Sequence, residues 1–357
     1  MTLIIAEAGV NHNGSEEMAL QLIDIASKAN ADIVKFQTFK ATELVTKNAE
    51  KALYQISNSP ESSSQLEMLK KLELSSKSYR ALSDKCKNLG IEFLSTAFDS
   101  NSLKFLINDI GLKRLKIPSG EINNAPLILE HARSGLDIII STGMANLDEI
   151  ETALGVIAFG YIGDDKIPKI DSFREAYNSE EGQRALKRKV HLLHCVSEYP
   201  APINEINLKA ITFLKSNFNL PVGYSDHSEG INLPLGAVAL GSSIIEKHFT
   251  ISRNLDGPDH KASLEPEELK QMIKNIRELD IALGKEIKIR TKSEEKNLAV
   301  IRKSIKAKKS IKSGEIFRPD NLTIKRPGVG MEPILYWDLL NQKATKDYLP
   351  GDIIDEE

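Results

Sequence analysis

The sequence of 357 residues contains only two cysteines, Cys86 and Cys195, and no long apolar run. Two thiols so far apart do not form the disulfide framework of a small secreted protein, so we expect a reducing, cytoplasmic compartment. No apolar stretch approaches the roughly 20 residues that a membrane-spanning helix needs. The first residues, MTLIIAEAG, lack the basic segment of a secretory signal and are interpreted as a strand.

The chain also lacks a strong imbalance of charge, with 47 lysines and arginines against 50 aspartates and glutamates. A net charge of -3 gives no reason to expect nucleic acid as a partner along the whole chain. Basic residues are nevertheless concentrated between Lys285 and Lys312. This stretch is either a solvated linker that leads into a new domain or a set of cations that faces an anionic substrate.

What the sequence does contain is a repeated alternation of short β-branched runs and longer helical patterns. Eight such runs begin at Leu3, Ala31, Ile91, Arg114, Asp137, Lys189, Pro221 and Ser243. Continuous apolar runs of this length are typical of strands buried on both faces of a parallel sheet. Eight strand-and-helix units in roughly 285 residues predict a (β/α)8 barrel, and an open doubly wound sheet is the alternative.

Two helices can be delimited from the residues at their ends. Asn146 followed by Glu149 is a capping box, which predicts a helix start. A last long helix is expected to begin at Pro266 and to end before Gly284. Its apolar residues have the spacing of one buried stripe: Leu269, Met272, Ile273, Ile276, Leu279 and Leu283.

Other segments depart from this alternation. The connection over residues 40–72 has helical character, and the polar stretch from Gly160 to Arg188 is expected to be a solvated, mobile surface insertion. After Gly284 short runs are separated by turn residues. We therefore predict a barrel domain at 1–284, a linker at 285–297 and a small turn-rich domain at 298–357. That last domain is short for an independent catalytic domain and is expected to complete a site elsewhere.

Polar side chains follow the predicted strands at the end where a (β/α)8 barrel has its active site. They are Glu7, Lys35, Gln37, Ser95, Thr96, Asp99, Lys116, Ser119, Glu121, Ser141, Thr142, His194, Ser197, Ser225, Asp226, His227, Glu246, Lys247 and His248. Burying an unpaired charge is costly, so this accumulation indicates a functional site. The alternative is that these residues neutralise one another as structural ion pairs.

His227 and His248 follow consecutive predicted strands and can converge in space. Neutral imidazoles suit a divalent transition metal such as manganese. Two histidines leave positions open for water and substrate oxygens. Asp226 or Asp259 could ligate the metal or orient an imidazole. The alternative is that these are ordinary core histidines.

Lys35 and Lys116 end the second and fourth predicted strands, and the hydroxyl groups nearby belong to Ser119, Ser141 and Ser225. Cations and hydroxyls that converge from several strands suit a ligand with a phosphate and a carboxylate, and phosphoenolpyruvate carries both. Lys116 could instead form a Schiff base with pyruvate. Glu7 and Glu121 are candidate proton carriers or structural counter-ions.

A series of motifs resembles the sialic acid synthase family. In chain order they are AEAGVNHNGS, KFQTFKA, STAFD, KIPSGEI, ISTGMA, LHCVSEYPAP, GYSDHS, EKHFT and GPDHKASLEP. The family includes N-acetylneuraminate synthases, N,N'-diacetyllegionaminate synthases and the more distant pseudaminate synthases. RPGVG near Arg326 is similar to the family's C-terminal antifreeze-like (SAF) domain. The resemblance covers nearly the whole chain and implies a (β/α)8 barrel followed by that small domain.

The resemblance also implies a role for each matching residue. His227 and His248 match metal ligands, with manganese the expected ion and magnesium or cobalt the alternatives. The positions that hold phosphoenolpyruvate are matched by Lys35, Lys116, Ser119, Ser141 and Ser225. The positions around the sugar and the metal are matched by Glu7, Gln37, Glu121, Tyr199 and Asp259. Among these, Glu7, Glu121 and Asp259 are the residues that we assign to catalysis. Ser197 matches a position where relatives carry a small polar residue of varying identity, and we assign it to substrate binding.

Arg326 matches an arginine that the antifreeze-like domain of a partner subunit lends to the N-acyl group of the sugar, in a domain-swapped homodimer. The implied reaction joins phosphoenolpyruvate to an open-chain 2-acetamido sugar and gives a nine-carbon 2-keto acid. The sugar is N-acetylmannosamine, 2,4-diacetamido-2,4,6-trideoxymannose or a relative of these. A Schiff-base pyruvate aldolase and a non-catalytic carbohydrate-binding protein remain alternative functions.

Overall fold

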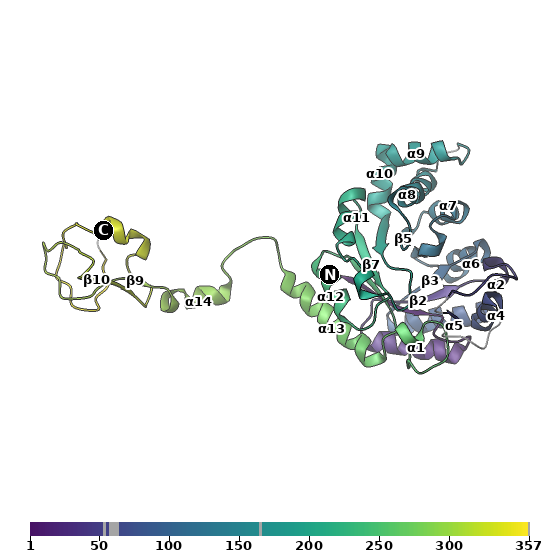
Figure 1. Cartoon of the computed structure of the whole chain (residues 1–357), viewed down its shortest axis with the longest axis horizontal. Coiled ribbons are helices and arrows are strands. Elements are labelled where there is room, and N and C mark those ends of the chain that lie inside the picture. Colours follow the sequence, from purple (N-terminus) through teal and green to yellow (C-terminus); the bar gives the residue numbers. More distant parts are fainter. Residues whose placement is uncertain (53–54, 57–63, 164–165, 356–357) are drawn as a thin grey trace. The chain divides into compact units, whose positions relative to one another are not determined.

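The computed structural model describes residues 1–52, 55–56, 64–163 and 166–355. The chain divides into two units, Met1–Gly284 and Lys285–Glu357 (Figure 1). Each unit has an apolar core of its own, so each is described by itself.

Eight parallel strands close into a barrel in the first unit and follow one another around it in sequence order. They are β1 (Leu3–Gly9), β2 (Ile33–Thr38), β3 (Glu92–Ala97), β4 (Arg114–Ile117), β5 (Asp137–Ser141), β6 (Val190–His194), β7 (Val222–Asp226) and β8 (Ile244–His248). Each begins at, or within about two residues of, the run predicted for it. The predicted (β/α)8 barrel is confirmed, and the open doubly wound sheet is excluded.

Apolar residues on both faces explain why these segments form barrel strands. In β2, Ile33, Val34 and Phe36 have no exposed surface. Because successive side chains of a strand point to opposite faces, one set packs against the helices and the other set fills the barrel. The register pairs Glu7 with Lys35 on one side and with His248 on the other, so the ends of these strands lie at one level.

Helices surround the barrel, as Figure 1 shows. They are α1 (Glu16–Lys28), α2 (Ala41–Leu44), α4 (Gln65–Leu72), α5 (Ser76–Leu89), α6 (Ser100–Phe105), α7 (Ala125–Arg133), α8 (Leu147–Ile162), α9 (Ile170–Asn178), α10 (Glu180–Lys189), α11 (Ala210–Phe218), α12 (Asn232–Ala239) and α13 (Pro266–Leu283). The capping box of Asn146 and Glu149 is present at the start of α8. The helix predicted from Pro266 to the residue before Gly284 is α13, so both predictions are confirmed.

The polar stretch from Gly160 to Arg188 is a packed helical segment, whereas we expected a solvated insertion. The helices α9 and α10 occupy most of it and contact α8, and residues 164–165 lie outside the described part of the chain. Phe173 of α9 packs edge-on against Phe159 of α8, with ring centroids 5.3 Å apart. Leu186 of α10 is buried. The prediction missed these helices because only a few, widely spaced apolar residues form their inner faces.

The predicted helical connection at residues 40–72 contains α2 and α4, and its residues 53–54 and 57–63 lie outside the described residues. The second unit contains α14 (Lys292–Ile301), α15 (Tyr336–Leu339) and an antiparallel pair of strands, β9 (Ser304–Ala307) and β10 (Leu322–Lys325). Over the residues for which a structure is given, no helix is long and apolar enough to cross a membrane.

A buried ion pair joins β7 to β8 on the side of the strands that faces away from the barrel interior. Lys247 Nζ lies 2.7 Å from Asp226 Oδ2, and neither side chain is exposed. Asp226 Oδ1 also accepts hydrogen bonds from the Tyr224 hydroxyl and from the amide and hydroxyl of Ser228. Lys247 donates a further hydrogen bond to the Ser228 carbonyl. This network holds the turn that carries His227.

Replacing Lys247 by methionine is expected to lower the free energy of unfolding by about 3–5 kcal/mol, because the Asp226 carboxylate stays buried without a counter-charge. Lys274→Met is the matched control, since Lys274 pairs with Glu278 on the exposed surface of α13. The control should cost less than about 1 kcal/mol. Urea denaturation followed by circular dichroism measures both variants, and equal losses would show that the buried pair has no special role.

Candidate active site

Four charged side chains from different strands meet inside the carboxyl end of the barrel. Lys35 Nζ lies 2.7 Å from Glu7 Oε2 and 3.6 Å from Glu246 Oε2. Lys116 Nζ lies 3.6 Å from Glu246 Oε1. None of these side chains is more than 6% exposed. Glu246 therefore lies between two lysines, and two cations are balanced by two carboxyl groups.

Hydroxyl groups form hydrogen bonds with three of these buried charged side chains, Lys116, Lys35 and Glu246. Lys116 Nζ donates to Ser141 Oγ at 2.7 Å, and Lys35 Nζ donates to Thr96 Oγ1 at 3.2 Å. Ser225 Oγ donates to Glu246 Oε1 at 2.9 Å. Two ammonium groups and three hydroxyls therefore lie together at the strand ends. Such a group of donors suits an oxyanion ligand, because each donor can exchange its present partner for a ligand oxygen.

The environment shifts the pKa values of the two carboxyl groups in opposite directions. Burial, together with the charge of Glu246, raises the pKa of Glu7 to about 7 although Lys35 opposes this. Burial alone would also raise the pKa of Glu246. The charges of Lys116 and Lys35 outweigh it, with help from the Ser225 hydroxyl, and lower that pKa to about 2. Glu246 therefore stays ionised, whereas Glu7 gains or loses a proton near neutral pH.

His227 and His248 lie side by side at the ends of β7 and β8, with ring centroids 5.8 Å apart. His227 Nδ1 is 2.6 Å from the Val196 carbonyl oxygen, to which it can only donate. Its Nε2 atom then carries the lone pair and lies 3.2 Å from both Ser225 Oγ and the Tyr199 hydroxyl. Hydrogen bonding thus fixes the tautomer that presents Nε2 as a ligand.

His248 Nδ1 is buried and has no hydrogen-bond partner among the described residues. The nearest carboxylate atom is Asp259 Oδ2, at 4.0 Å. Burial lowers the pKa of His227 to about 4 and that of His248 well below its usual value, so both imidazoles are neutral at neutral pH. Neutral imidazole nitrogens with an unused lone pair fit a divalent transition metal.

No group of three or more His, Cys, Asp or Glu side chains is arranged to hold a metal ion in the part of the chain that the structure describes. An ion held by His227 and His248 would therefore take its other ligands from water or substrate oxygens. Such a coordination shell has the open positions that a catalytic metal requires.

A cavity of about 430 Å³ opens at this end of the barrel. The predicted site residues that line it are Gln37, Ser119, Glu121, Ser197, Tyr199, His248 and Asp259. Ser119 Oγ and Ser197 Oγ lie 3.1 Å apart. Gly143 makes this approach possible, because a Cβ atom there would lie 2.3 Å from Ser119 Cβ and its φ is +46°. The structure therefore brings these seven predicted residues to one opening, which we call the mouth cavity. The other predicted barrel residues lie in the charged cluster and the imidazole pair described above: Glu7, Lys35, Lys116, Ser141, Ser225 and His227.

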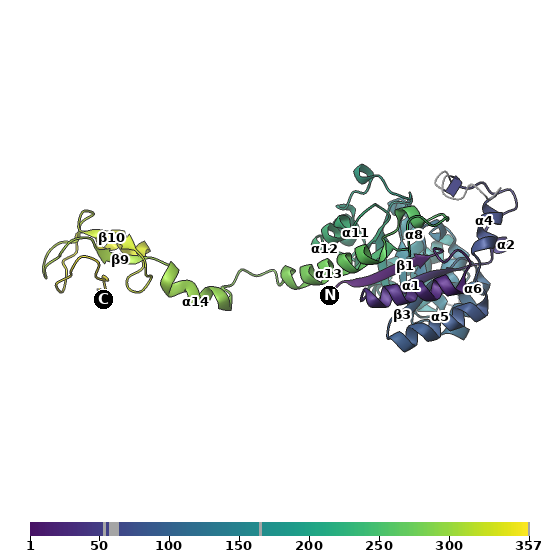
Figure 2. The same cartoon turned by 90° about the horizontal axis from the view of Figure 1, so that it is seen from below.

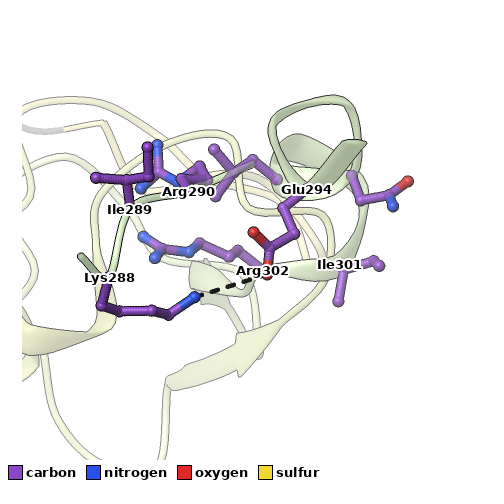
Figure 3. A pocket seen from close by; sticks show the side chains of 8 residues that line it. Lys288, Ile289, Arg290, Glu294, Ile301 and Arg302 are labelled. Atoms are coloured by element: carbon purple, nitrogen blue, oxygen red, sulfur yellow. Dashed lines mark ion pairs between the residues drawn. The ribbon is translucent and has the colours of Figure 1, made fainter. Parts of the chain in front are cut away.

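Arg326 belongs to the second unit, where it is exposed and directly follows β10. A cavity of about 480 Å³ also lies in that unit, between α14 and the chain before it. Figure 3 shows that Lys288 in this cavity reaches toward Glu294, and their charged atoms are 4.0 Å apart. None of the predicted site residues lines it.

The sequence predicts a role at the metal for Asp226 and none for Glu246, and the structure shows the opposite placement. Glu246 points into the barrel together with His248, two positions along β8, whereas Lys247 points outward to Asp226. Asp226 therefore supports the β7 turn from outside and does not face the imidazole pair. The two-residue alternation of strand side chains is the signal that identifies Glu246.

Comparisons with known proteins agree with this geometry. Residues 22–288 match the model of the NeuB family. An N,N'-diacetyllegionaminic acid synthase of Campylobacter jejuni is 49% identical over 99% of both chains. A protein of the same name from Legionella pneumophila is 46% identical over 98% of this chain and 92% of its own length. The crystal structure of an N-acetylneuraminic acid synthetase from Leptospira borgpetersenii is 35% identical over 83% of this chain and 90% of its own, with a TM-score of 0.67.

The raised pKa of Glu7 predicts how stability depends on pH in the metal-free protein. The folded state binds more protons than the unfolded state between the ordinary pKa of 4.5 and about 7. The contribution of Glu7 is therefore fully present below that window and is lost as pH rises through it, by up to about 1.4 kcal/mol per pH unit. Glu7→Gln should remove this slope. Urea denaturation from about pH 5 to about pH 8 tests the prediction, and parallel slopes in both proteins would contradict it.

Proposed function

The chain belongs to the NeuB family of sialic acid synthases, and from that premise we propose that it condenses phosphoenolpyruvate with an N-acetylated mannosamine-type sugar. The products are a nine-carbon sialic-acid-type 2-keto acid and inorganic phosphate. The observation that carries the proposal is the pair of buried lysines, Lys35 and Lys116, which share Glu246 beside two neutral imidazoles.

The acceptor that we propose is the open-chain form of 2,4-diacetamido-2,4,6-trideoxymannose, so that the product is N,N'-diacetyllegionaminate. The names of the relatives from Campylobacter and Legionella support this choice over N-acetylmannosamine, since each covers nearly the whole chain at more than 45% identity. N-acetylneuraminate remains the alternative product.

Phosphoenolpyruvate would bind through its two anionic ends. Lys35 and Lys116 supply the positive charge, and the serine hydroxyls at the strand ends supply additional donors: Ser119, Ser141 and Ser225. Lys116 and Ser141 are already 2.7 Å apart, so their donors are held in place before the ligand arrives. Glu246 holds the two lysines in position from the other side.

A divalent metal, for which we propose Mn²⁺ with Mg²⁺ or Co²⁺ as alternatives, would be held by His227 and His248. When bound, it supplies a positive charge that polarises the aldehyde oxygen of the sugar. Asp259, 4.0 Å from His248 Nδ1, is placed to accept hydrogen bonds from water or from sugar hydroxyls at the same point. The Val196 carbonyl keeps His227 in the tautomer that such a site needs.

In the proposed reaction, C3 of phosphoenolpyruvate forms a bond to the aldehyde carbon, and the aldehyde oxygen takes up a proton. Glu7, whose pKa is raised to about 7, can supply that proton at neutral pH. The positive charge that develops at C2 is stabilised by the Glu121 carboxylate at the mouth. Water adds at C2 and loses a proton, and the C2–O bond to phosphate then breaks. Phosphate leaves from between the two lysines.

We further propose that the second unit is an antiparallel, antifreeze-like module that acts in a homodimer, where Arg326 would reach the N-acyl group of a sugar bound to the partner subunit. The exposure of Arg326 supports this role. A cytoplasmic location is also proposed, because both cysteines are free and buried.

One observation favours a second candidate, a Schiff-base aldolase. Burial and the charge of Lys35 lower the pKa of Lys116, as in lysine nucleophiles. Because Lys116 is engaged by Ser141 and Glu246, we expect no covalent adduct when the protein is treated with pyruvate and borohydride. Intact-protein mass spectrometry checks this. A mass increase that Lys116→Arg abolishes would favour the aldolase.

His248→Ala should lower the rate of sugar-dependent phosphate release by at least about 1,000-fold and abolish Mn²⁺ binding, because one of the two nitrogen ligands is lost. His191→Gln is the control, since His191 lies in β6 and does not line the mouth cavity. Phosphate release and Mn²⁺ titration by electron paramagnetic resonance measure the two effects. Unchanged metal binding in His248→Ala would refute the assignment of the ligands.

A further inference from the structure

One side of the mouth cavity is apolar. We call it the mouth cluster: it consists of Val10, Phe39, Met68 and Leu72, with Leu44, Leu69 and Phe98 packed against them. All of these residues line the cavity. The cluster is separate from the core that fills the barrel. An apolar group of this kind at the opening of an otherwise polar site indicates contact with an apolar part of a ligand.

The chain topology places this cluster opposite the polar side of the cavity. The mouth cluster comes from the segments that follow β1, β2 and β3, including α2 and α4, which lie side by side in Figures 1 and 2. The polar lining residues Ser119, Tyr199 and Asp259 come from the segments after β4, β6 and β8. Because the strands follow one another around the barrel, these two groups occupy different parts of its rim.

The apolar side also offers no positive charge. Among the described residues that line the cavity there is no lysine or arginine, and the acidic ones are Glu121 and Asp259. The polar groups on the apolar side are two neutral amides, those of Gln55 and Gln65. A phosphate group placed there would lose its hydration and gain no counter-ion, which is strongly unfavourable.

We propose that the mouth cluster is a specificity subsite that receives the C6 end of the acceptor sugar and selects a C6 methyl group over a C6 hydroxyl or phosphate. This inference rests on the proposed function, which requires the C1 aldehyde to lie beside the lysines and imidazoles. The opposite end of the open-chain sugar then extends toward the rim. A methyl group there displaces water from apolar surface. A hydroxyl would lose its hydration and find only the amides of Gln55 and Gln65, of which Gln65 Nε2 already donates to Gln55 Oε1 at 3.5 Å.

The test compares three acceptors that differ only at C6: the 6-deoxy sugar 2,4-diacetamido-2,4,6-trideoxymannose, its 6-hydroxy counterpart and the 6-phosphate of that counterpart. With the unaltered chain, kcat/KM for the 6-deoxy sugar should exceed that for the 6-hydroxy sugar by about 10- to 100-fold. The 6-phosphate should give no measurable turnover.

Leu44→Gln and Leu69→Gln should reduce this preference to within about threefold, because each places an amide on the apolar side. Both side chains are only partly buried, so the changes are compatible with folding. The KM for phosphoenolpyruvate should stay the same. Leu89→Gln is the matched control, since Leu89 is 43% exposed on α5 and does not line the cavity. It should leave the preference unchanged.

Two results would overturn the subsite while leaving the proposed function intact. One is equal kcat/KM for the 6-deoxy and 6-hydroxy sugars in the unaltered chain. The other is a loss of rate in Leu44→Gln and Leu69→Gln that is the same for both sugars. If the proposed function itself is wrong, none of the three sugars causes phosphoenolpyruvate to be consumed. That result would refute the proposed subsite as well.

Discussion

The site is organised around four buried ionisable side chains whose charges must balance: Lys35, Lys116, Glu7 and Glu246. Two ammonium groups in a barrel interior are stable only beside anions, because charge is poorly solvated there. Glu246 meets this need for both lysines at once, at 3.6 Å from each. The phosphate and carboxylate of bound phosphoenolpyruvate can become the counter-ions of the two lysines. Glu7, with a pKa near neutrality, can then bind a proton and so offset part of the added negative charge.

The barrel makes this arrangement possible by bringing distant parts of the sequence to one level. Glu7 is in register with Lys35 and with His248, although β8 follows β1 by more than two hundred residues in the chain. Because successive side chains of β8 point to opposite faces, Glu246 and His248 point into the site. Lys247 points to the outside of the barrel, where it pairs with Asp226. One strand thus contributes both a counter-ion for the lysines and a candidate metal ligand, while its outer face stabilises the turn that holds His227.

Much of the fold could be predicted from the sequence, because parallel barrel strands are apolar on both faces and are separated by amphipathic helices. The eight strands are therefore visible as apolar runs, and Asn146 and Pro266 mark helix starts correctly. The helices at 170–178 and 180–189 were not predicted, since their polar composition hides the few residues that pack on α8.

The residues that stand at the strand ends could be predicted for the same reason, but the directions in which their side chains point could not. An apolar run shows where a strand lies, yet Asp226, Glu246 and Lys247 appear equivalent until the inward positions are known. The mouth cluster was also hidden, because Phe39, Met68 and Leu72 lie in a connection whose spatial position depends on tertiary packing. The roles assigned to Glu121, Asp259 and Arg326 continue to rest on the resemblance to the family.

In the proposed reaction the barrel mouth joins phosphoenolpyruvate to an amino sugar and cleaves the C2–O bond of phosphoenolpyruvate. Mass spectrometry of both products tests this reaction when phosphoenolpyruvate carries ¹⁸O in the oxygen that bridges C2 and phosphorus, with Mn²⁺ and 2,4-diacetamido-2,4,6-trideoxymannose present. We expect a nine-carbon 2-keto acid without label and inorganic phosphate with the label. Label retained in the keto acid, or phosphate release that does not depend on the sugar, would contradict it.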